Sequence, residues 1–280
     1  MKNGELLYFL LVLFYSIDGY NQKTFSEKFK YKATYELQYQ SDSLNENSRK
    51  SEEMVLYIGD NISQFSSKGA NIKDSIRDAY SDKPHTMKNF YEMQSKVPKT
   101  NFRYFVYKGI PDGQLTFTEK IVKDNLRYTQ NRALMDWEIH SETKQISGYN
   151  VKKASTNFAG RKYIAWFTPE IPVSDGPYKF NGLPGLIMEI SDIQKHYSFK
   201  LINFKNLEEP VIFKYSSEDY IEATQKEFNN AKHTFKRDPY GALDGVGITI
   251  LGESENRKQR NREIKREMKK RNNPIELNNI

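Results

Sequence analysis

Apolar and polar residues alternate along several short stretches of this chain, most clearly over residues 29–40. The apolar set there is Phe29, Tyr31, Ala33, Tyr35, Leu37 and Tyr39, and the intervening polar set is Lys30, Lys32, Thr34, Glu36, Gln38 and Gln40. A period of two residues places all apolar side chains on one face of an extended strand. Residues 29–40 are therefore predicted to form a β-strand with one buried face.

Other strand-like stretches follow in pairs. They are 54–59 and 62–66, bent at Gly59-Asp60-Asn61; 102–108 and 114–123, joined through Pro111-Asp112-Gly113; 126–130 and 135–140; 151–158 and 162–168, joined across Gly160-Arg161; and 186–193 and 197–204. Gly, Pro and Asp at the joints are typical of tight turns. Consecutive hairpins with short connections indicate an antiparallel meander. The predicted hairpins include 126–130 with 135–140, 151–158 with 162–168, and 186–193 with 197–204.

Helical spacing is rarer. Ile72, Ile76, Ala79 and Tyr80 predict a short helix, and residues 218–235 predict a longer one with an acidic first turn. Residues 241–252 are Gly-rich with alternating Val and Ile, and are interpreted as an edge strand or a loop that folds back.

A sheet of about ten or more strands must curl or split to cover its apolar face. The expected fold is therefore mainly β: a large curved antiparallel meander, shaped like a half-barrel or bowl. One or two helices accompany it, one of them in the concavity, and a charged C-terminal tail follows.

A Pro- and Gly-rich stretch, residues 164–192, separates two of the predicted strands. Its most distinctive part is the hexapeptide Gly182-Leu183-Pro184-Gly185-Leu186-Ile187. Pro184-Gly185 suits the central positions of a type II turn, and its apolar neighbours indicate a bend packed against the core. None of the six side chains can transfer a proton, ligate a metal or attack an electrophile, so the hexapeptide is interpreted as a structural motif.

The hexapeptide stands in a longer series of motifs. They are Asp136-Trp137, Ile146-Ser147-Gly148-Tyr149, Lys153-Ala154, Phe158-Ala159-Gly160-Arg161, Ala165-Trp166-Phe167-Thr168, Ile171-Pro172, Gly176-Pro177, Lys179-Phe180 and Asn272-Asn273-Pro274-Ile275-Glu276-Leu277. Over the whole mature chain this series resembles the GLPGLI family, exported Bacteroidetes proteins of unknown function. The resemblance implies an outer-membrane TonB-dependent receptor as the partner context. Relatives often carry a Cys where this chain has Asn150 and Val151, so a disulfide there cannot form.

The N-terminus indicates export. Residues 6–17 form an apolar run preceded by Lys2, too short to cross a bilayer, which needs roughly 20 residues. Such a run is typical of a secretory signal peptide, here assigned to residues 1–19, although Glu5 is atypical and no A-x-A site follows. The alternative is a buried N-terminal helix of a cytosolic protein. Without Cys the chain cannot be a lipoprotein. The expectation is a periplasmic or secreted protein with one β-rich domain over residues 20–253.

The net charge of +7 is concentrated in the tail, residues 254–280. Residues 255–273 hold nine Lys or Arg against three Glu, so they carry six of the seven net positive charges. The rest of the chain is close to neutral, which argues against a nucleic-acid-binding protein. The tail is interpreted as a solvated helix or disordered arm. The alternatives are an arm that contacts phosphate or an acidic membrane surface, and one that contacts nucleic acid.

Chemical motifs are scarce. The four histidines, His85, His140, His196 and His233, lack metal-ligand spacing, and neither a nucleophile elbow nor a phosphate loop is present. Neighbouring carboxylates fit solvated charges or helix caps. No catalytic residue, metal site or cofactor is predicted.

Several side chains near the hexapeptide nevertheless form a candidate ligand site. They are Asp136, Trp137, Arg161, Trp166, Phe167, Glu170, Asp175, Tyr178 and Phe180. The structural interpretation is a buried pair of Arg161 with a carboxylate that fixes the loop. Two functions remain open: a non-catalytic binding or accessory protein whose curved sheet holds an apolar or peptide-like ligand, and a hydrolase with a carboxylate site near Glu170 and Asp175.

Overall fold

The structure is a computed structural model that describes residues 24–80, 82–84, 86–244 and 254–277. The predicted signal peptide lies outside the described residues, as does most of the Gly-rich stretch 241–252. None of the helices within the described ranges has the length and hydropathy needed to cross a membrane.

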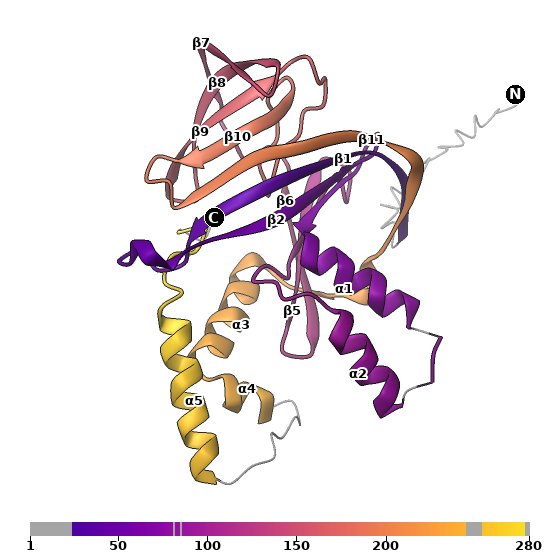
Figure 1. The fold of residues 1–280 in the computed structure, drawn as a ribbon, viewed down its shortest axis with the longest axis vertical. Helices are drawn as coiled ribbons and strands as arrows, with labels where there is room; N and C mark the ends of the chain where they lie inside the picture. Colours follow the sequence, from indigo (N-terminus) through magenta and orange to yellow (C-terminus); the bar gives the residue numbers. More distant parts are fainter. Residues whose placement is uncertain (1–23, 81, 85, 245–253, 278–280) are drawn as a thin grey trace, which may run out of the picture.

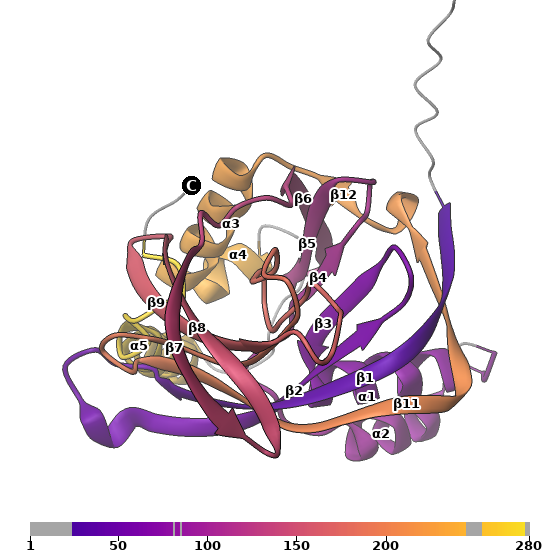
Figure 2. The same cartoon turned by 90° about the horizontal axis from the view of Figure 1, so that it is seen from above.

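Twelve strands form one open sheet in the order β12-β6-β5-β4-β3-β2-β1-β11-β10-β9-β8-β7. The strands are β1 Thr24–Gln40, β2 Arg49–Ile58, β3 Ser63–Ser67, β4 Phe105–Lys108, β5 Gln114–Ile121, β6 Asp124–Asn131, β7 Glu138–Ile146, β8 Tyr149–Phe158, β9 Arg161–Thr168, β10 Leu186–Asp192, β11 Tyr197–Ser216 and β12 Ile221–Glu222. All neighbours are antiparallel except β12 and β6, so the sheet is mixed. The expected mainly β, curved sheet is confirmed, and Figure 2 shows how strongly its strands curve.

The central strand β1 confirms the predicted strand, and its burial alternates as expected except that Tyr31 is only half-buried and the polar Gln40 is buried. Phe29, Ala33, Tyr35, Leu37 and Tyr39 are buried. β1 pairs with β2 on one side and along its whole length with β11 on the other. β11 is much longer than the predicted 197–204, because residues 211–216 also pair with β1, beyond a register shift at residues 207–210. This second part contains the β-branched and aromatic run Val211-Ile212-Phe213, which the sequence analysis did not identify as a strand. Figure 1 shows the two strands running together across the molecule.

One predicted hairpin is wrong. β6 pairs with β5 and β12, whereas β7 pairs with β8 at the opposite end of the sheet. The connection between them spans the open side of the sheet instead of turning back. Trp137 Nε1 donates to the carbonyl of Asn181 at 2.8 Å, and Asn181 Nδ2 donates to the carbonyl of Arg132 at 3.2 Å. These long-range contacts outweigh the local preference for a hairpin.

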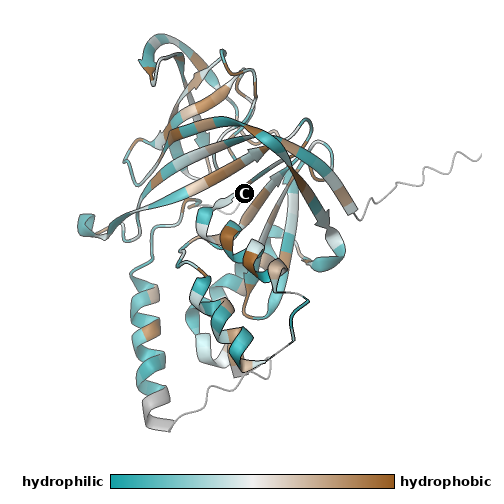
Figure 3. Ribbon diagram, turned by 45° about the vertical axis from the view of Figure 1, so that its right-hand side comes forward, coloured by the Kyte–Doolittle hydropathy of each residue, from teal (hydrophilic) through white to brown (hydrophobic). Residues whose placement is uncertain are grey.

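The described residues contain five helices, more than the one or two expected. They are α1 Lys68–Ala79, α2 Met87–Lys96, α3 Gln225–Arg237, α4 Pro239–Asp244 and α5 Ser254–Lys269. The short helix predicted at residues 72–80 is α1. The sequence did not predict α2, and α4 stands where an edge strand or loop was expected. In the tail, the helical alternative is the one observed, as α5, which Figure 3 shows to be largely hydrophilic.

The longer predicted helix begins later than residue 218, because a capping box starts it. Thr224 Oγ1 accepts from the amide of Glu227 at 3.2 Å, and the Glu227 carboxylate accepts from the amide of Thr224 at 2.8 Å. This arrangement satisfies two amides that would otherwise lack partners. Phe228 of α3 contacts the rings of Phe117 and Tyr128, with centroids 5.5 and 5.0 Å apart. α3 thus covers the inner face of β5 and β6.

The core is rich in buried tyrosine, which predicts a sharp alkaline limit to stability. Burial raises the pKa of Tyr35, Tyr104, Tyr107 and Tyr178 well above its usual value near 10. The unfolded chain would ionise these rings near pH 10 while the folded chain keeps them protonated. The folded state therefore keeps its full stability below pH 10 and loses about 1.4 kcal/mol per pH unit and tyrosine above it.

We expect tyrosinate absorbance to rise in one cooperative step above pH 10, together with loss of the far-ultraviolet dichroism. Tyr91, which is 64% exposed, provides the control, because its replacement by Phe removes a hydroxyl that is not buried in the core and should leave the cooperative step in place. A gradual absorbance rise with the dichroism retained would contradict the prediction.

Candidate functional site

The candidate site is built around loop 169–185, the connection between β9 and β10. Leu183, Leu186 and Ile187 are buried, with Leu183 only 1% exposed, whereas Pro184 is exposed. Tyr35 of β1 donates its hydroxyl to the carbonyl of Ile187 at 2.8 Å. The loop therefore runs through the interior of the curved sheet and does not form an ordinary surface turn.

The bend at Pro184 is tighter than the type II turn expected from the sequence. The amide of Gly185 donates to the carbonyl of Leu183 at 2.8 Å, which closes a three-residue γ-turn centred on Pro184. Gly185 has φ +145°, far from the +80° or so that a type II turn needs at this position. The cause is close packing: a Cβ on Gly185 would lie 2.6 Å from the carbonyl carbon of Thr168 and closer still to its oxygen.

A buried ion pair connects the loop to β4. The ammonium of Lys108, 0% exposed, pairs with the carboxylate of Asp175, 3% exposed. It also donates to the carbonyl of Gly176 at 2.6 Å, and the amide of Gly176 donates to Asp175 Oδ1 at 2.7 Å. Burial lowers the pKa of Lys108, and the charge of Asp175 opposes this shift. The two opposite charges thus compensate each other, and both groups are hydrogen-bonded inside the sheet.

A second buried lysine connects the loop to β6 and to the C-terminal segment 273–277. Lys179 Nζ lies 2.5 Å from the Glu276 carboxylate and donates to the hydroxyl of Tyr128 at 2.9 Å. The hydroxyl of Tyr178 donates to Glu276 at 2.6 Å. Burial lowers the pKa of Lys179 while Glu276 raises it. The loop therefore holds residues that are distant in the sequence in one polar network.

Arg161 binds the same C-terminal segment from the start of β9. Its NH1 donates to Asp192 Oδ2 at 3.0 Å. Its NH2 donates to Asn273 Oδ1 at 2.5 Å and to the carbonyl of Pro274 at 2.7 Å, and its Nε donates to the carbonyl of Ile275 at 3.1 Å. A buried Arg161–carboxylate pair exists as expected, but it fixes segment 273–277 and not loop 169–185.

The other predicted site residues lie in different surroundings. Asp136 is exposed, Trp137 and Trp166 are half-buried, and Phe167, Tyr178 and Phe180 are buried. The ring of Trp166 lies under Lys144 Nζ, 4.3 Å from the ring centroid. Glu170 is exposed and accepts from the amide of Asn150 at 2.9 Å. Glu170 and Asp175 thus differ sharply, one facing solvent and the other buried against Lys108.

Four charged partners were missed by the sequence reasoning: Lys108, Lys179, Asp192 and Glu276. Lys179 and Glu276 lie inside quoted motifs, but nothing in the sequence pairs them. Lys108 gave a weak signal, because it lies two residues after Val106 in β4 and therefore shares its inward face. Their partners lie far away in the chain, which no local pattern reveals.

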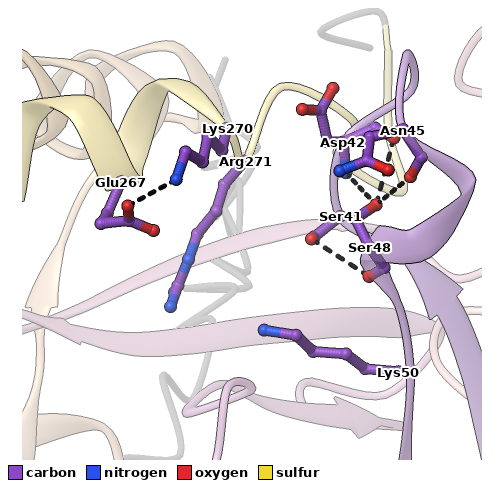
Figure 4. A pocket seen from close by; sticks show the side chains of 8 residues that line it. All are labelled: Ser41, Asp42, Asn45, Ser48, Lys50, Glu267, Lys270 and Arg271. Atoms are coloured by element: carbon purple, nitrogen blue, oxygen red, sulfur yellow. Dashed lines mark hydrogen bonds and ion pairs between the residues drawn. The ribbon is translucent and has the colours of Figure 1, made fainter.

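A polar pocket lies outside this network. It has a volume of about 170 Å³ and is lined by Ser41, Asp42, Asn45, Ser48, Lys50, Glu267, Lys270 and Arg271. Figure 4 shows it between the β1–β2 turn and the end of α5. It contains none of the site residues predicted from the sequence. Across the described ranges, no three His, Asp or Glu side chains are grouped so as to hold a metal ion.

Comparison with known proteins gives a family match for the loop region. A family model described as "Protein of unknown function (Porph_ging)" matches residues 157–189, which include β9, loop 169–185 and the first residues of β10. No curated protein matches the chain.

Two solved structures of PNGF-II, in different crystal forms, resemble the fold with TM-scores of 0.48 and 0.46. Each is 14% identical, and the similarity covers 72% of this chain. It covers only 33% and 32% of those chains, so this protein spans about a third of their length. The family match described above, which covers residues 157–189, includes the whole of loop 169–185.

Proposed function

We propose that this chain is an exported GLPGLI-family protein of the cell envelope, a non-catalytic accessory protein that binds a partner through the free edge of its sheet. The concave side of the sheet is occupied by the chain itself, and this favours a partner that binds to an outer surface. Loop 169–185 and segment 273–277 fill the concave side, and the buried charges there are matched in the pairs Lys108–Asp175, Arg161–Asp192 and Lys179–Glu276. A ligand that displaced one partner of such a pair would face a cost of about 3–5 kcal/mol.

The observation that carries the proposal is the exposed edge strand β7. It pairs with β8 alone, and all but two of its nine residues are exposed. The β7–β8 turn is Ser147-Gly148, both with positive φ, as in a type I′ hairpin. In such a hairpin Ile146 and Lys144 bond to β8, so the backbone groups of Thr143 and Gln145 point away from the sheet. An extended peptide can add to this edge through main-chain hydrogen bonds.

The proposed partner is an extended segment of another envelope protein. The family resemblance favours an outer-membrane receptor of the TonB-dependent type. Ile139 is 50% exposed at the start of β7 and offers an apolar contact next to Glu138 and Glu142. The irregular pairing between Ile139 and Thr143 limits regular pairing to the part of the edge that follows, which suits a short segment.

Replacing Thr143 by proline tests this proposal, because it removes an outward amide without breaking a bond to β8. We expect thermal stability to change by less than about 1 kcal/mol. A photoreactive residue at position 145 should form one defined adduct with an envelope protein in the native cell, and Thr143→Pro should abolish it. The matched control places the photoreactive residue at Gln38, an exposed position in β1 that pairs with β11 on one side and with β2 on the other. No adduct at position 145, or an adduct insensitive to Thr143→Pro, would overturn the proposal.

The hydrolase alternative has no comparable structural support. It needs Glu170 and Asp175 to act on one substrate, but Asp175 is occupied by Lys108 and by the amide of Gly176. If the alternative were correct, Glu170→Gln would lower a hydrolytic rate about 100-fold or more.

A further inference from the structure

The polar pocket between the β1–β2 turn and α5 is held in shape by contacts from distant parts of the chain. Asn272 accepts from the amide of Ser43 at 2.9 Å and donates to Asp42 Oδ1 at 2.8 Å. Asn273 Nδ2 donates to the carbonyl of Gln40 at 2.8 Å. From α3, Lys236 Nζ donates to the carbonyl of Arg271 at 2.6 Å. The end of α5 is therefore fixed beside the turn, and the pocket is part of the folded structure.

The two carboxylates of the pocket are already engaged. Asp42 Oδ1 accepts from Asn272 and from the amide of Leu44 at 3.1 Å. Glu267 pairs with Lys270 at 2.6 Å. Neither carboxylate pairs with the two remaining cations, Lys50 and Arg271.

Lys50 and Arg271 converge on the same space. Figure 4 shows both side chains extending into the pocket, one from β2 and one from the end of α5. In the part of the chain that the structure describes, neither side chain has a hydrogen bond or an ion pair, although the pKa of Glu267 is lowered by its hydrogen bond with Lys270 and also by the charge of Arg271. Both side chains are exposed, so solvent screens part of their mutual repulsion, and an anion between them would lower it further. A further cation lies near Arg271: burial lowers the pKa of Lys236, and the charge of Arg271 lowers it further.

We propose that this pocket binds a phosphate group between the guanidinium of Arg271 and the ammonium of Lys50. A guanidinium binds two oxygens of a tetrahedral anion, and an ammonium supplies a compact charge to a third. The volume of about 170 Å³ admits a phosphate with one small substituent. The source of the phosphate is either a free anion or the headgroup of an acidic lipid, towards which the exposed cations of α5, such as Arg262 and Arg266, would add attraction.

The test compares binding of inorganic phosphate with binding to phosphatidylcholine vesicles that contain phosphatidylglycerol, at about 0.15 M salt, where screening is strong beyond about 8 Å. Arg271→Gln and Lys50→Gln should each weaken binding about tenfold or more. The backbone contacts of Arg271 remain in the first variant, so the fold is kept. Lys269→Gln is the matched control, because it removes one exposed charge from the same end of α5 without touching the pocket.

Saturable binding of inorganic phosphate that the two pocket variants weaken and the control does not would support the site and identify free phosphate as a source. Vesicle binding alone, with the same pattern among the variants, would support the site with a lipid headgroup as the source. Absence of both kinds of binding, or an equal effect of Lys269→Gln, would overturn the proposal, since net charge would then account for any attraction. The outcome is independent of the β7 edge and of its partner.

Discussion

Replacing Gly185 by alanine is expected to destabilise the protein by about 4 kcal/mol, the largest effect of any single methyl group in loop 169–185. Two costs add. The backbone at φ +145° is strained for any residue with a Cβ, and that Cβ would overlap with the carbonyl group of Thr168. The obstacle is the backbone of Thr168 at the end of β9, which is paired with β10 and cannot rotate away as a side chain could. A loss of this size approaches the whole stability of a typical domain.

Urea unfolding of Gly185→Ala and of Gly148→Ala measures the effect with its control. Gly148 also has a positive φ, +86°, but a Cβ there would meet nothing within 4 Å. Its replacement should therefore cost only the left-handed strain, about 1 kcal/mol. Equal losses for the two variants would mean that close approach to Thr168 contributes nothing. If Gly185→Ala yields no folded protein while Gly148→Ala folds normally, the prediction is met in its strongest form.

Replacing Arg161 by leucine is expected to cost about 3–5 kcal/mol, because it leaves the carboxylate of Asp192 buried without its cation. The side chains of Arg161 and Asp192 are 2% and 0% exposed, so water cannot solvate the carboxylate in place of the guanidinium. The same substitution removes the hydrogen bonds to Asn273, Pro274 and Ile275. Segment 273–277 should then detach from the sheet, and trypsin should cleave after Lys270 or Arg271 faster than in the unchanged protein.

The control for Arg161 is an ion pair at the surface. Lys153 and Glu142 lie 2.8 Å apart, but their side chains are 27% and 54% exposed. Lys153→Leu should cost less than about 1 kcal/mol, as is usual for solvated pairs. Unchanged proteolysis after Arg271 in Arg161→Leu would show that segment 273–277 is held by its other contacts, such as the hydroxyl of Tyr197 with the carbonyl of Asn273.

Local sequence patterns sufficed for the parts of the fold that local physics controls. The alternation in residues 29–40 specifies which face of β1 is buried, since successive side chains of a strand point in opposite directions. Turn residues such as Pro111-Asp112-Gly113 mark the joint between β4 and β5. Apolar residues around Pro184 similarly indicate a bend in contact with the core, although the tighter γ-turn depends on how closely Gly185 approaches Thr168.

The arrangement of the candidate site lies beyond such patterns. Arg161 and Asp175 stood out in the sequence as charged residues of the loop region, yet their partners Asp192 and Lys108 did not. Arg161 and Asp192 lie in the neighbouring strands β9 and β10. Lys108 of β4, by contrast, reaches Asp175 in loop 169–185, which the curved sheet brings close. A lysine in an alternating strand has the same sequence signal whether it reaches solvent or a carboxylate 67 positions away.

The chain alone therefore determined which segments are strands, where most of them turn and which faces they bury, because these follow from hydrogen bonding and side-chain direction over a few residues. Tertiary structure decided that β6 and β7 lie at opposite ends of the sheet, that loop 169–185 fills its interior and that Asn273 to Leu277 close over it. These features depend on desolvated charges finding partners across the fold, and the free energy of such a pair is set by its three-dimensional surroundings.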